Sequence, residues 1–301
     1  MAVCVATYRQ PEGLRELLQK LALQEFARDD HPRIDVIVVD NDAAGSAAGV
    51  CREFLGRRWN WHYLIEPRRG IPQARNRAVA SARALGCGFI AFIDDDERPS
   101  ACWLHHLLRA QTSFQADIVQ GRAAPLFQPR PEKWIVDGGI FEHMHRSTGD
   151  RLDIAATNNV LVKSDVFARL GGFEESWALC GGTDSLFFSK AARAGFRIVY
   201  CSEALCHELI GPDRANGAWI CRRALRVGIT LSQVNLALDP GWKTRFGSAR
   251  LGLRLMLEAS ARLLLPPSWG DCDLLRLRAR KLCTGAGIFA GNLGFKYQEY
   301  R

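Results

Sequence analysis

Mostly apolar runs and helical repeats alternate along the first two thirds of the chain. The runs predict buried strands at Ala2–Ala6, Ile34–Val39, Phe89–Ile93, Asp117–Gln120, Asn158–Lys163 and Arg197–Cys201. Apolar residues at helical spacing predict helices from Pro11 onward, over Gln73–Leu85, around Trp103–Phe114 and over Thr183–Ala194. Because apolar strands alternate with helices, the sequence predicts an α/β fold with a mostly parallel sheet flanked by helices.

Two acidic clusters directly follow predicted strands. Asp40 and Asp42 end the second strand, and the run from Asp94 to Asp96 ends the third. Ligands of such sheets bind beyond the carboxyl ends of the strands, so both clusters are expected to face one crevice. Crowded carboxylates repel one another, and a divalent cation, Mn²⁺ or Mg²⁺, relieves that repulsion and bridges a diphosphate. Taken alone, each cluster is also compatible with a solvated acidic turn.

Three further residues suit phosphate, proton and metal chemistry. Arg75 stands near a predicted helix start, behind a basic loop, which suits a diphosphate. Asp184 follows two glycines and falls in a first helical turn, where the helix dipole favours the charged form that a general base needs. His207 follows the last predicted strand, and a neutral imidazole is able to complete a metal shell. A surface arginine, a helix-start aspartate and a packed histidine are the ordinary alternatives.

Charge is unevenly distributed over the 301 residues. Residues 1–213 hold 25 Lys/Arg and 27 Asp/Glu, whereas residues 214–301 hold 15 and 5, which gives −2 and +10 and sums to the net charge of +8. A nearly neutral body with a basic tail predicts an anionic partner for the tail. The 10 cysteines are scattered singly without a CxxC pair, which favours a reducing cytosol.

The tail contains a predicted amphipathic helix over residues 246–265. One of its faces carries Ala249, Leu253, Met256, Leu257, Ser260 and Leu264, and another carries Arg250, Arg254, Glu258 and Arg262. This pattern is typical of a helix lying at a membrane interface, and the basic stripe extends to residue 281. A helix docked on the catalytic domain is the alternative. No apolar run reaches about 18 residues, so we expect no membrane span.

The order of the motifs resembles that of the glycosyltransferase family 2 enzymes with the GT-A fold. The resemblance rests on residues 3–9, 38–42, 74–76, 92–97, 171–173 and 181–184. Residues 219–223, 226–228 and 297–300 resemble bacterial exopolysaccharide transferases of the succinoglycan type. The resemblance implies a GT-A, Rossmann-like catalytic domain over residues 1–228 and a basic helical extension over 229–301.

The resemblance also implies roles for single residues. The implied nucleotide-sugar contacts are Thr7, Arg9, Asp40, Asp42, Arg75, Asp94 and Asp95. Asp96 matches the metal ligand of the family's DxD motif, and His207 aligns with a late histidine that binds the metal in some GT-A enzymes. Asp184 matches the catalytic base, although Thr183 replaces the first acid of the family's Glu-Asp pair.

The implied activity is an inverting, metal-dependent transfer of a sugar from a nucleotide diphosphate to a glycan or polyprenyl-linked glycan. UDP-glucose is the expected donor by family habit, although no residue identifies the sugar. The acceptor is expected across residues 122–157, where Trp134, Phe141, His143 and His145 suit sugar rings or pack among themselves. An anionic membrane surface is the expected partner of residues 246–281, on the cytosolic face of the inner membrane.

Other classes of protein fit the sequence less well. A nucleotidyltransferase of related fold needs a glycine-rich triphosphate loop, and the segment from Thr7 to Pro11 has no glycine. Binding of nucleic acid by the tail is not expected, because its basic residues lack zinc spacing and interleaved aromatics. A pseudo-enzyme that binds a sugar nucleotide without turnover is a further alternative, because Thr183 replaces the first acid of the family's Glu-Asp pair.

Overall fold

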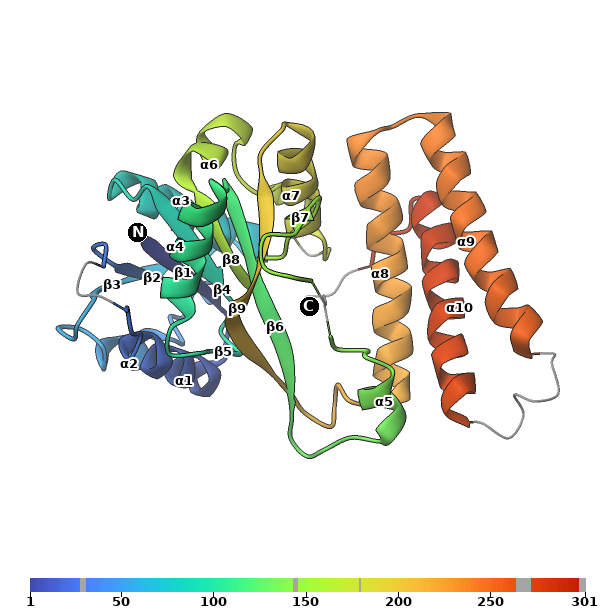
Figure 1. Ribbon diagram of the computed structural model, residues 1–301, viewed down its shortest axis with the longest axis horizontal. Coiled ribbons are helices and arrows are strands. Elements are labelled where there is room, and N and C mark those ends of the chain that lie inside the picture. The colour runs from blue at the N-terminus through green and yellow to red at the C-terminus, as the bar shows by residue number, and fades with distance from the viewer. Residues whose placement is uncertain (28–30, 143–145, 179, 264–271, 298–301) are drawn as a thin grey trace. The chain divides into compact units, whose positions relative to one another are not determined.

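The computed structural model describes residues 1–27, 31–142, 146–178, 180–263 and 272–297. The chain divides into two compact units (Figure 1). The first, called here the catalytic unit, comprises residues 1–126, 142–178 and 183–209. The second, the helical unit, comprises residues 127–141, 179–182 and 210–301.

A nine-stranded mixed sheet organises the catalytic unit, in the order β3-β2-β1-β4-β8-β6-β9-β5, with β7 paired to β9. The strands are β1 (Ala2–Thr7), β2 (Asp35–Asp40), β3 (Asn60–Ile65), β4 (Phe89–Ile93), β5 (Glu97–Pro99), β6 (Ile118–Phe127), β7 (Arg151–Leu152), β8 (Asn159–Lys163) and β9 (Ile198–Ile210). Strands β1 to β4 are parallel, whereas β8 pairs antiparallel with β4 and β6, and β9 pairs antiparallel with β5 and β7. The predicted parallel arrangement therefore holds for β1 to β4, and the rest of the sheet is antiparallel.

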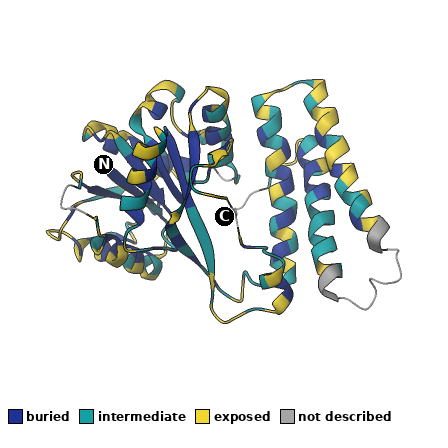
Figure 2. Cartoon of the chain, in the orientation of Figure 1, coloured by how far each residue is buried: buried dark blue, intermediate teal, exposed yellow. Residues whose placement is uncertain are grey.

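Helices cover both faces of this sheet, and its central strands are buried on both sides (Figure 2). One face packs against α1 (Pro11–Ala22), α2 (Ala48–Arg52) and α4 (Trp103–Phe114). The other packs against α3 (Ile71–Ala84), α6 (Ser164–Leu170) and α7 (Thr183–Arg193). Alternate residues of each strand supply the two cores, as in β1, where Val3 and Val5 face one core and Ala2 and Cys4 the other.

The helical unit contains α5 (Lys133–Asp137), α8 (Gly217–Leu238), α9 (Trp242–Leu263) and α10 (Cys272–Asn292). Leu225 lies opposite Gly287 and Ile229 lies opposite Gly291, so α8 and α10 run parallel in close contact. A Cβ atom at Gly291 would stand 2.6 Å from the carbonyl oxygen of Ile229, so the approach requires glycine.

The structure confirms the predicted α/β fold and finds each predicted strand and helix. The predicted boundary at residue 228 lies within α8. Residues 246–263 of the predicted tail helix belong to α9, and residues 264 and 265 lie outside the described residues. The structure adds β3, β5 and β7, which the sequence pattern did not indicate, and extends the last predicted strand to Ile210. Among the described residues, no helix has both the length and the apolar character that crossing a membrane requires.

Candidate active site

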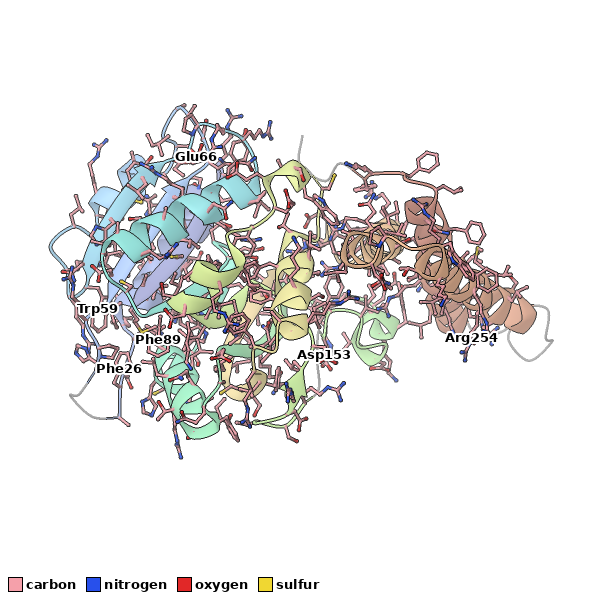
Figure 3. All side chains as sticks on the ribbon, turned by 90° about the horizontal axis from the view of Figure 1, so that it is seen from above. Phe26, Trp59, Glu66, Phe89, Asp153 and Arg254 are labelled. Carbon is pink, nitrogen blue, oxygen red and sulfur yellow. The ribbon has the colours of Figure 1, made fainter. Side chains whose placement is uncertain are left out.

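The carboxyl ends of three neighbouring parallel strands bring the predicted site residues together. Strand β1 lies between β2 and β4, and Thr7 at its end pairs in register with Asp40. The Thr7 hydroxyl donates a 2.7 Å hydrogen bond to Oδ2 of Asp95, which follows β4. Figure 3 shows Glu66, just beyond the end of β3, far from Trp59 at the start of that strand. The site therefore belongs to the edge marked by Glu66.

Asp40 shapes the turn after β2. Its buried carboxylate accepts hydrogen bonds from the backbone amides of Asp42 and Ala47 and from the Tyr63 hydroxyl, at 2.9, 2.7 and 2.9 Å. The resemblance implies a nucleoside contact here, whereas in this structure the Asp40 carboxylate is engaged by the protein. Asp42 forms a 3.0 Å ion pair with Arg9, and the hydrogen bond from Arg9 lowers the pKa of Asp42.

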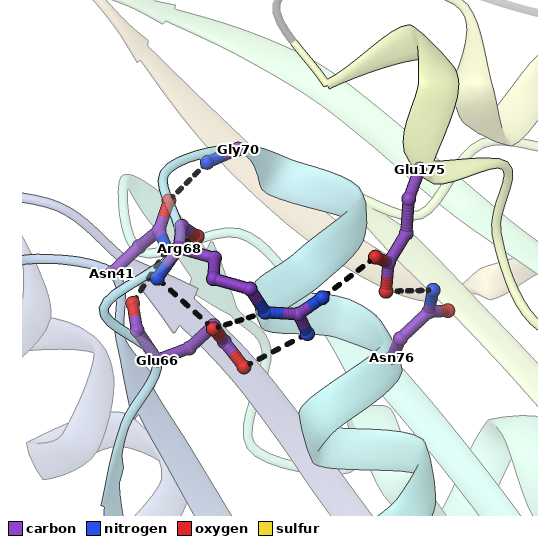
Figure 4. A network of polar contacts seen from close by, with 6 residues as sticks. All are labelled: Asn41, Glu66, Arg68, Gly70, Asn76 and Glu175. Atoms are coloured by element: carbon purple, nitrogen blue, oxygen red, sulfur yellow. Dashed lines mark hydrogen bonds and ion pairs between the residues drawn. The ribbon is translucent and has the colours of Figure 1, made fainter.

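The next residue, Asn41, anchors the loop between β3 and α3 (Figure 4). Its amide donates to the carbonyl oxygens of Glu66 and Arg68, both at 2.9 Å, and its Oδ1 accepts from the backbone amide of Gly70 at 2.8 Å. Gly70 has a φ of 142°, which favours glycine. No function was assigned to Asn41 from the sequence.

The Arg68 side chain completes the same network. Its guanidinium bonds to Glu66 at 3.0 Å and to Glu175 at 2.9 Å, and Glu175 also accepts from Asn76 on α3 at 3.1 Å (Figure 4). The loop is thus tied at one end to β2 and at the other to α3 and the 3-10 turn Glu175–Trp177. These contacts fix the segment that leads into the N-terminus of α3.

Arg75 connects α3 to the acidic run after β4. The guanidinium of this largely buried residue donates to Oδ1 of Asp94 at 3.2 Å, and it lies 6.0 Å from the centre of the Phe173 ring. Asp94 is partly exposed. A positive group is therefore held beside the first carboxylate of the run.

The carboxylates of this edge repel one another. The pKa of Asp94 is raised by desolvation, against the effect of Arg75, and by the charges of Asp184 and Glu208. Desolvation and the charges of its two neighbouring aspartates raise the pKa of Asp95 to about 7, although the hydrogen bond from Thr7 opposes the rise. In the absence of a positive ion, this edge resists being fully charged.

Glu97, on β5, is a buried member of the same cluster. Its Oε1 accepts a 3.0 Å hydrogen bond from Asn158, while Oε2 has no hydrogen-bond partner among the described residues. Desolvation, the charge of Glu208 and the charges of two aspartates of the run raise its pKa well above the ordinary value. No function was assigned to Glu97 from the sequence, in which it directly follows the acidic run.

Strand β9 presents Glu208 and His207 on opposite faces. Glu208 pairs in register with Glu97, and His207 pairs with Arg98. Since neighbouring strand residues project to opposite sides, the Glu208 side chain shares the face of Glu97 and the imidazole of His207 does not. The sequence reading selected His207 and missed Glu208, which pairing with the short strand β5 brings to the cluster.

Asp184 lies in the first turn of α7, as its sequence context predicted. Its Oδ1 accepts a 2.7 Å hydrogen bond from the backbone amide of Ser185, and its side chain is partly exposed. The charge of Asp184 is close enough to Asp94 to raise the pKa of that residue. The helix start and the acidic run after β4 therefore belong to one electrostatic site.

Two of the predicted acceptor residues are core residues. Trp134 and Phe141 are buried in a hydrophobic cluster with Ile135, Ile210 and Ile220. The alternative that these aromatics pack among themselves is the correct one for this pair. His143 and His145 lie outside the described residues.

The described residues contain no ready-made group of three or more His, Cys, Asp or Glu side chains able to hold a metal ion. The donor set nevertheless suits a hard divalent cation, because it consists of carboxylates that repel one another, with one buried oxygen of Glu97 left unpartnered. The residue types therefore fit such an ion. Its binding would change the distances between these carboxylates.

Comparison with known proteins places this geometry in a family. The profile described as Glycosyl transferase family 2 matches residues 2–171. The chain is 31% identical over 297 residues to the succinoglycan biosynthesis protein ExoM of Rhizobium meliloti (strain 1021), a match that covers 98% of this chain and 93% of that protein.

Solved structures agree in fold. The mannosyltransferase PcManGT from Pyrobaculum calidifontis, in complex with GDP-Man and Mn²⁺, superposes with a TM-score of 0.61 at 20% identity, covering 96% of this chain and 86% of that one. S. aureus TarS 1–349, in complex with UDP, gives a TM-score of 0.55 at 16% identity, covering 99% and 92%. The chain therefore belongs to glycosyl transferase family 2 and is a glycosyltransferase with the GT-A fold.

Proposed function

We propose that this glycosyltransferase moves a sugar from a nucleotide diphosphate to a hydroxyl group of a glycan or polyprenyl-linked glycan, with inversion at the anomeric carbon. The observation that carries the proposal is the position of Asp184 in the first turn of α7, where its charge raises the pKa of Asp94, the carboxylate that Arg75 hydrogen-bonds. A base for the acceptor and a positive group for the leaving diphosphate are what a single displacement requires.

The comparisons support a nucleotide-sugar donor. The two solved structures of similar fold are complexes with UDP and with GDP-Man, and the sequence relative is a succinoglycan biosynthesis protein. We propose UDP-glucose as the donor and an exopolysaccharide precursor as the acceptor. Thr7, Arg9 and Asp42 stand at the ends of β1 and β2, the edge where we propose that the nucleoside binds, while Asp40 holds the turn that carries Asp42.

We propose that a divalent cation, Mn²⁺ or Mg²⁺, binds the acidic cluster with Asp96 as a ligand. When bound, such an ion neutralises charge on the departing diphosphate. We propose Glu208 as a further ligand in place of His207, because Glu208 shares the face of Glu97 and acts electrostatically on Asp94. The unpartnered oxygen of Glu97 supports the same assignment.

The residues of the chain then have distinct tasks. Arg75, a largely buried residue of α3, gives a fixed positive charge to the diphosphate when Asp94 turns to the donor. The hydroxyl of Thr7 holds Asp95 in place by its 2.7 Å hydrogen bond. Asp184 accepts the proton of the acceptor hydroxyl as that oxygen attacks.

The test is the substitution Asp184→Asn. Because the amide cannot accept the proton, sugar transfer should fall on the order of 10²-fold or more, while UDP binding and the melting temperature change little. Asp165→Asn is the matched control, since Asp165 occupies the same second position of a helix, α6, and is exposed. If Asp184→Asn transfers sugar as fast as Asp165→Asn, Asp184 is not the base.

We also propose that the helical unit places the enzyme on an anionic membrane surface, at the cytosolic face of the inner membrane. In α9, the buried residues Ser248, Gly252 and Ala259 lie toward α10, and Leu253 and Leu257 of the predicted apolar face are exposed. This arrangement supports an interfacial helix.

The basic stripe is partly neutralised within the unit. Arg254 (labelled in Figure 3) and Lys281 both pair with Glu258, and Arg276 pairs with Glu132. Leu264 and the side chain of Arg262 lie outside the described residues. The attraction to lipid must therefore come in large part from other cations of the unit.

A further inference from the structure

The Trp and Phe side chains that the described residues leave exposed all belong to the helical unit. They are Trp242, Phe246, Phe289 and Phe295. Trp242 and Phe246 share one face at the start of α9, and Phe289 shares a face with Leu293 at the end of α10. The exposed large hydrophobic residues of the catalytic unit are aliphatic. Exposed aromatics gathered in one region mark an interaction surface.

Hydrogen bonds bring these two helix ends together. The Arg245 guanidinium donates to the carbonyl oxygen of Asn292 at 2.9 Å, and the Asn292 amide donates to the carbonyl oxygen of Arg245 at 3.1 Å. Gln233 of α8 donates to the carbonyl oxygen of Phe295. The start of α9, the last turns of α8 and the end of α10 thus form one end of the helical unit.

The C-terminal cap of α10 holds the backbone of Phe295 in place. Gly294 adopts the left-handed conformation, with φ of 91°, and its amide donates to the carbonyl oxygen of Gly291 at 3.0 Å. The amide of Phe295 donates to the carbonyl oxygen of Ala290, also at 3.0 Å, which completes a Schellman motif. Phe295 is 65% exposed and Leu293 71% exposed despite this ordered backbone.

Positive charge surrounds these apolar side chains. Trp242 is 73% exposed and Phe246 65% exposed, and the Lys243 ammonium lies 6.0 Å from the centre of the Trp242 ring. Residues 240–257 contain four basic residues and no acidic one, and Lys296 follows Phe295 directly. Tryptophan and phenylalanine beside lysine and arginine is the composition that binds the interface of an anionic bilayer.

We propose that Trp242, Phe246, Leu293 and Phe295, called here the aromatic tip, insert into the headgroup region of an anionic lipid bilayer. The inference rests on the proposed membrane role and assigns it to one end of the helical unit. Lys243, Arg245 and Lys296 contact the lipid phosphates, while the apolar side chains enter the acyl boundary.

The experiment is co-sedimentation of the full chain with vesicles of phosphatidylcholine alone or mixed with phosphatidylglycerol. The variant Trp242→Ser/Phe246→Ser should bind the mixed vesicles about tenfold or more weakly than wild type, because the bilayer no longer buries two apolar side chains. Leu23→Ser/Leu55→Ser is the matched control, since both leucines are exposed residues of the catalytic unit, and it should bind as wild type does. Lys243→Glu/Lys296→Glu should remove the preference for the anionic vesicles.

Equal loss of binding in the tip and control variants would overturn the proposal, as would wild type that stays in the supernatant at low salt. Light scattering tests whether a second copy of the chain binds the tip instead. If the wild type is a dimer that does not bind vesicles and the tip variant is a monomer, the tip is a contact between two copies and the proposal is wrong. UDP-sugar hydrolysis without vesicles separates this proposal from the enzymatic one. A chain that binds vesicles through the tip but neither hydrolyses nor transfers sugar supports the tip and contradicts the proposed reaction.

Discussion

Replacing Asn41 by alanine should loosen the loop between β3 and α3 and destabilise the catalytic unit. The buried side-chain amide makes three hydrogen bonds of 2.8 to 2.9 Å to the backbone of residues 66–70. Each such bond contributes about 1 kcal/mol net, so Asn41→Ala should lower the free energy of unfolding by about 3 kcal/mol. Equilibrium urea unfolding, followed by tryptophan fluorescence and circular dichroism, measures this loss.

The same substitution should weaken donor binding. A loop released from β2 must be ordered again when the nucleotide binds, and ordering the backbone of one residue already costs about 1–2 kcal/mol. Calorimetry with UDP and Mn²⁺ should therefore show at least about a tenfold weaker affinity. Asn41→Asp should not rescue either property, because a carboxylate cannot donate to the carbonyl oxygens of Glu66 and Arg68.

Asn60→Ala is the control, since Asn60 is an exposed residue at the start of β3. Its free energy of unfolding should stay within about 0.5 kcal/mol of wild type. A loss below about 1 kcal/mol for Asn41→Ala, together with unchanged UDP affinity, would refute the reasoning that the three hydrogen bonds hold the loop.

Two further predictions concern charge. Calorimetry should show that UDP binds at least about tenfold more weakly with EDTA than with Mn²⁺. Glu208→Gln should abolish most of that difference in affinity, whereas His207→Ala should preserve it. If His207→Ala abolishes the difference and Glu208→Gln preserves it, His207 is the metal ligand. Burial raises the pKa of Asp35, but hydrogen bonds from His62 and Arg33 outweigh it and leave the pKa lowered. Asp35→Asn should therefore lower the free energy of unfolding by about 1–3 kcal/mol at neutral pH. Unfolding curves should show this difference from wild type shrinking as the pH falls below about 4, where the wild-type carboxylate takes up a proton. A difference that does not depend on pH would contradict this.

The location of the site was predictable because it follows from local pattern and one topological rule. Apolar strands followed by Asp40 and by the run from Asp94 to Asp96 place those carboxylates at one sheet edge if the strands are parallel, and β1, β2 and β4 are parallel. Asp184 was predictable for a similar reason, because a threonine and an aspartate at the beginning of a helical pattern mark a helix start.

The contributions of Glu97 and Glu208 were not predictable, because they depend on a pairing between distant segments. Strand β5 has three residues and ends in Pro99, so it has no periodicity to detect and reads as an acidic turn. Only its antiparallel pairing with β9 sets which residue of the His207–Glu208 pair faces the cluster. A shift of one residue in that register would exchange their roles.

The proposed reaction makes the order of binding a consequence of these charges. Arg75 is paired with Asp94, and Asp95 has a pKa of about 7 because burial and its neighbours oppose a further negative charge. A diphosphate entering this edge alone would meet the same repulsion, since it adds negative charge beside Asp94 and Glu97. A bound divalent cation would supply positive charge at this edge, and the carboxylates would bind it in their charged form. The nucleotide sugar should therefore enter together with the cation or after it, and binding of the pair should release protons to the buffer.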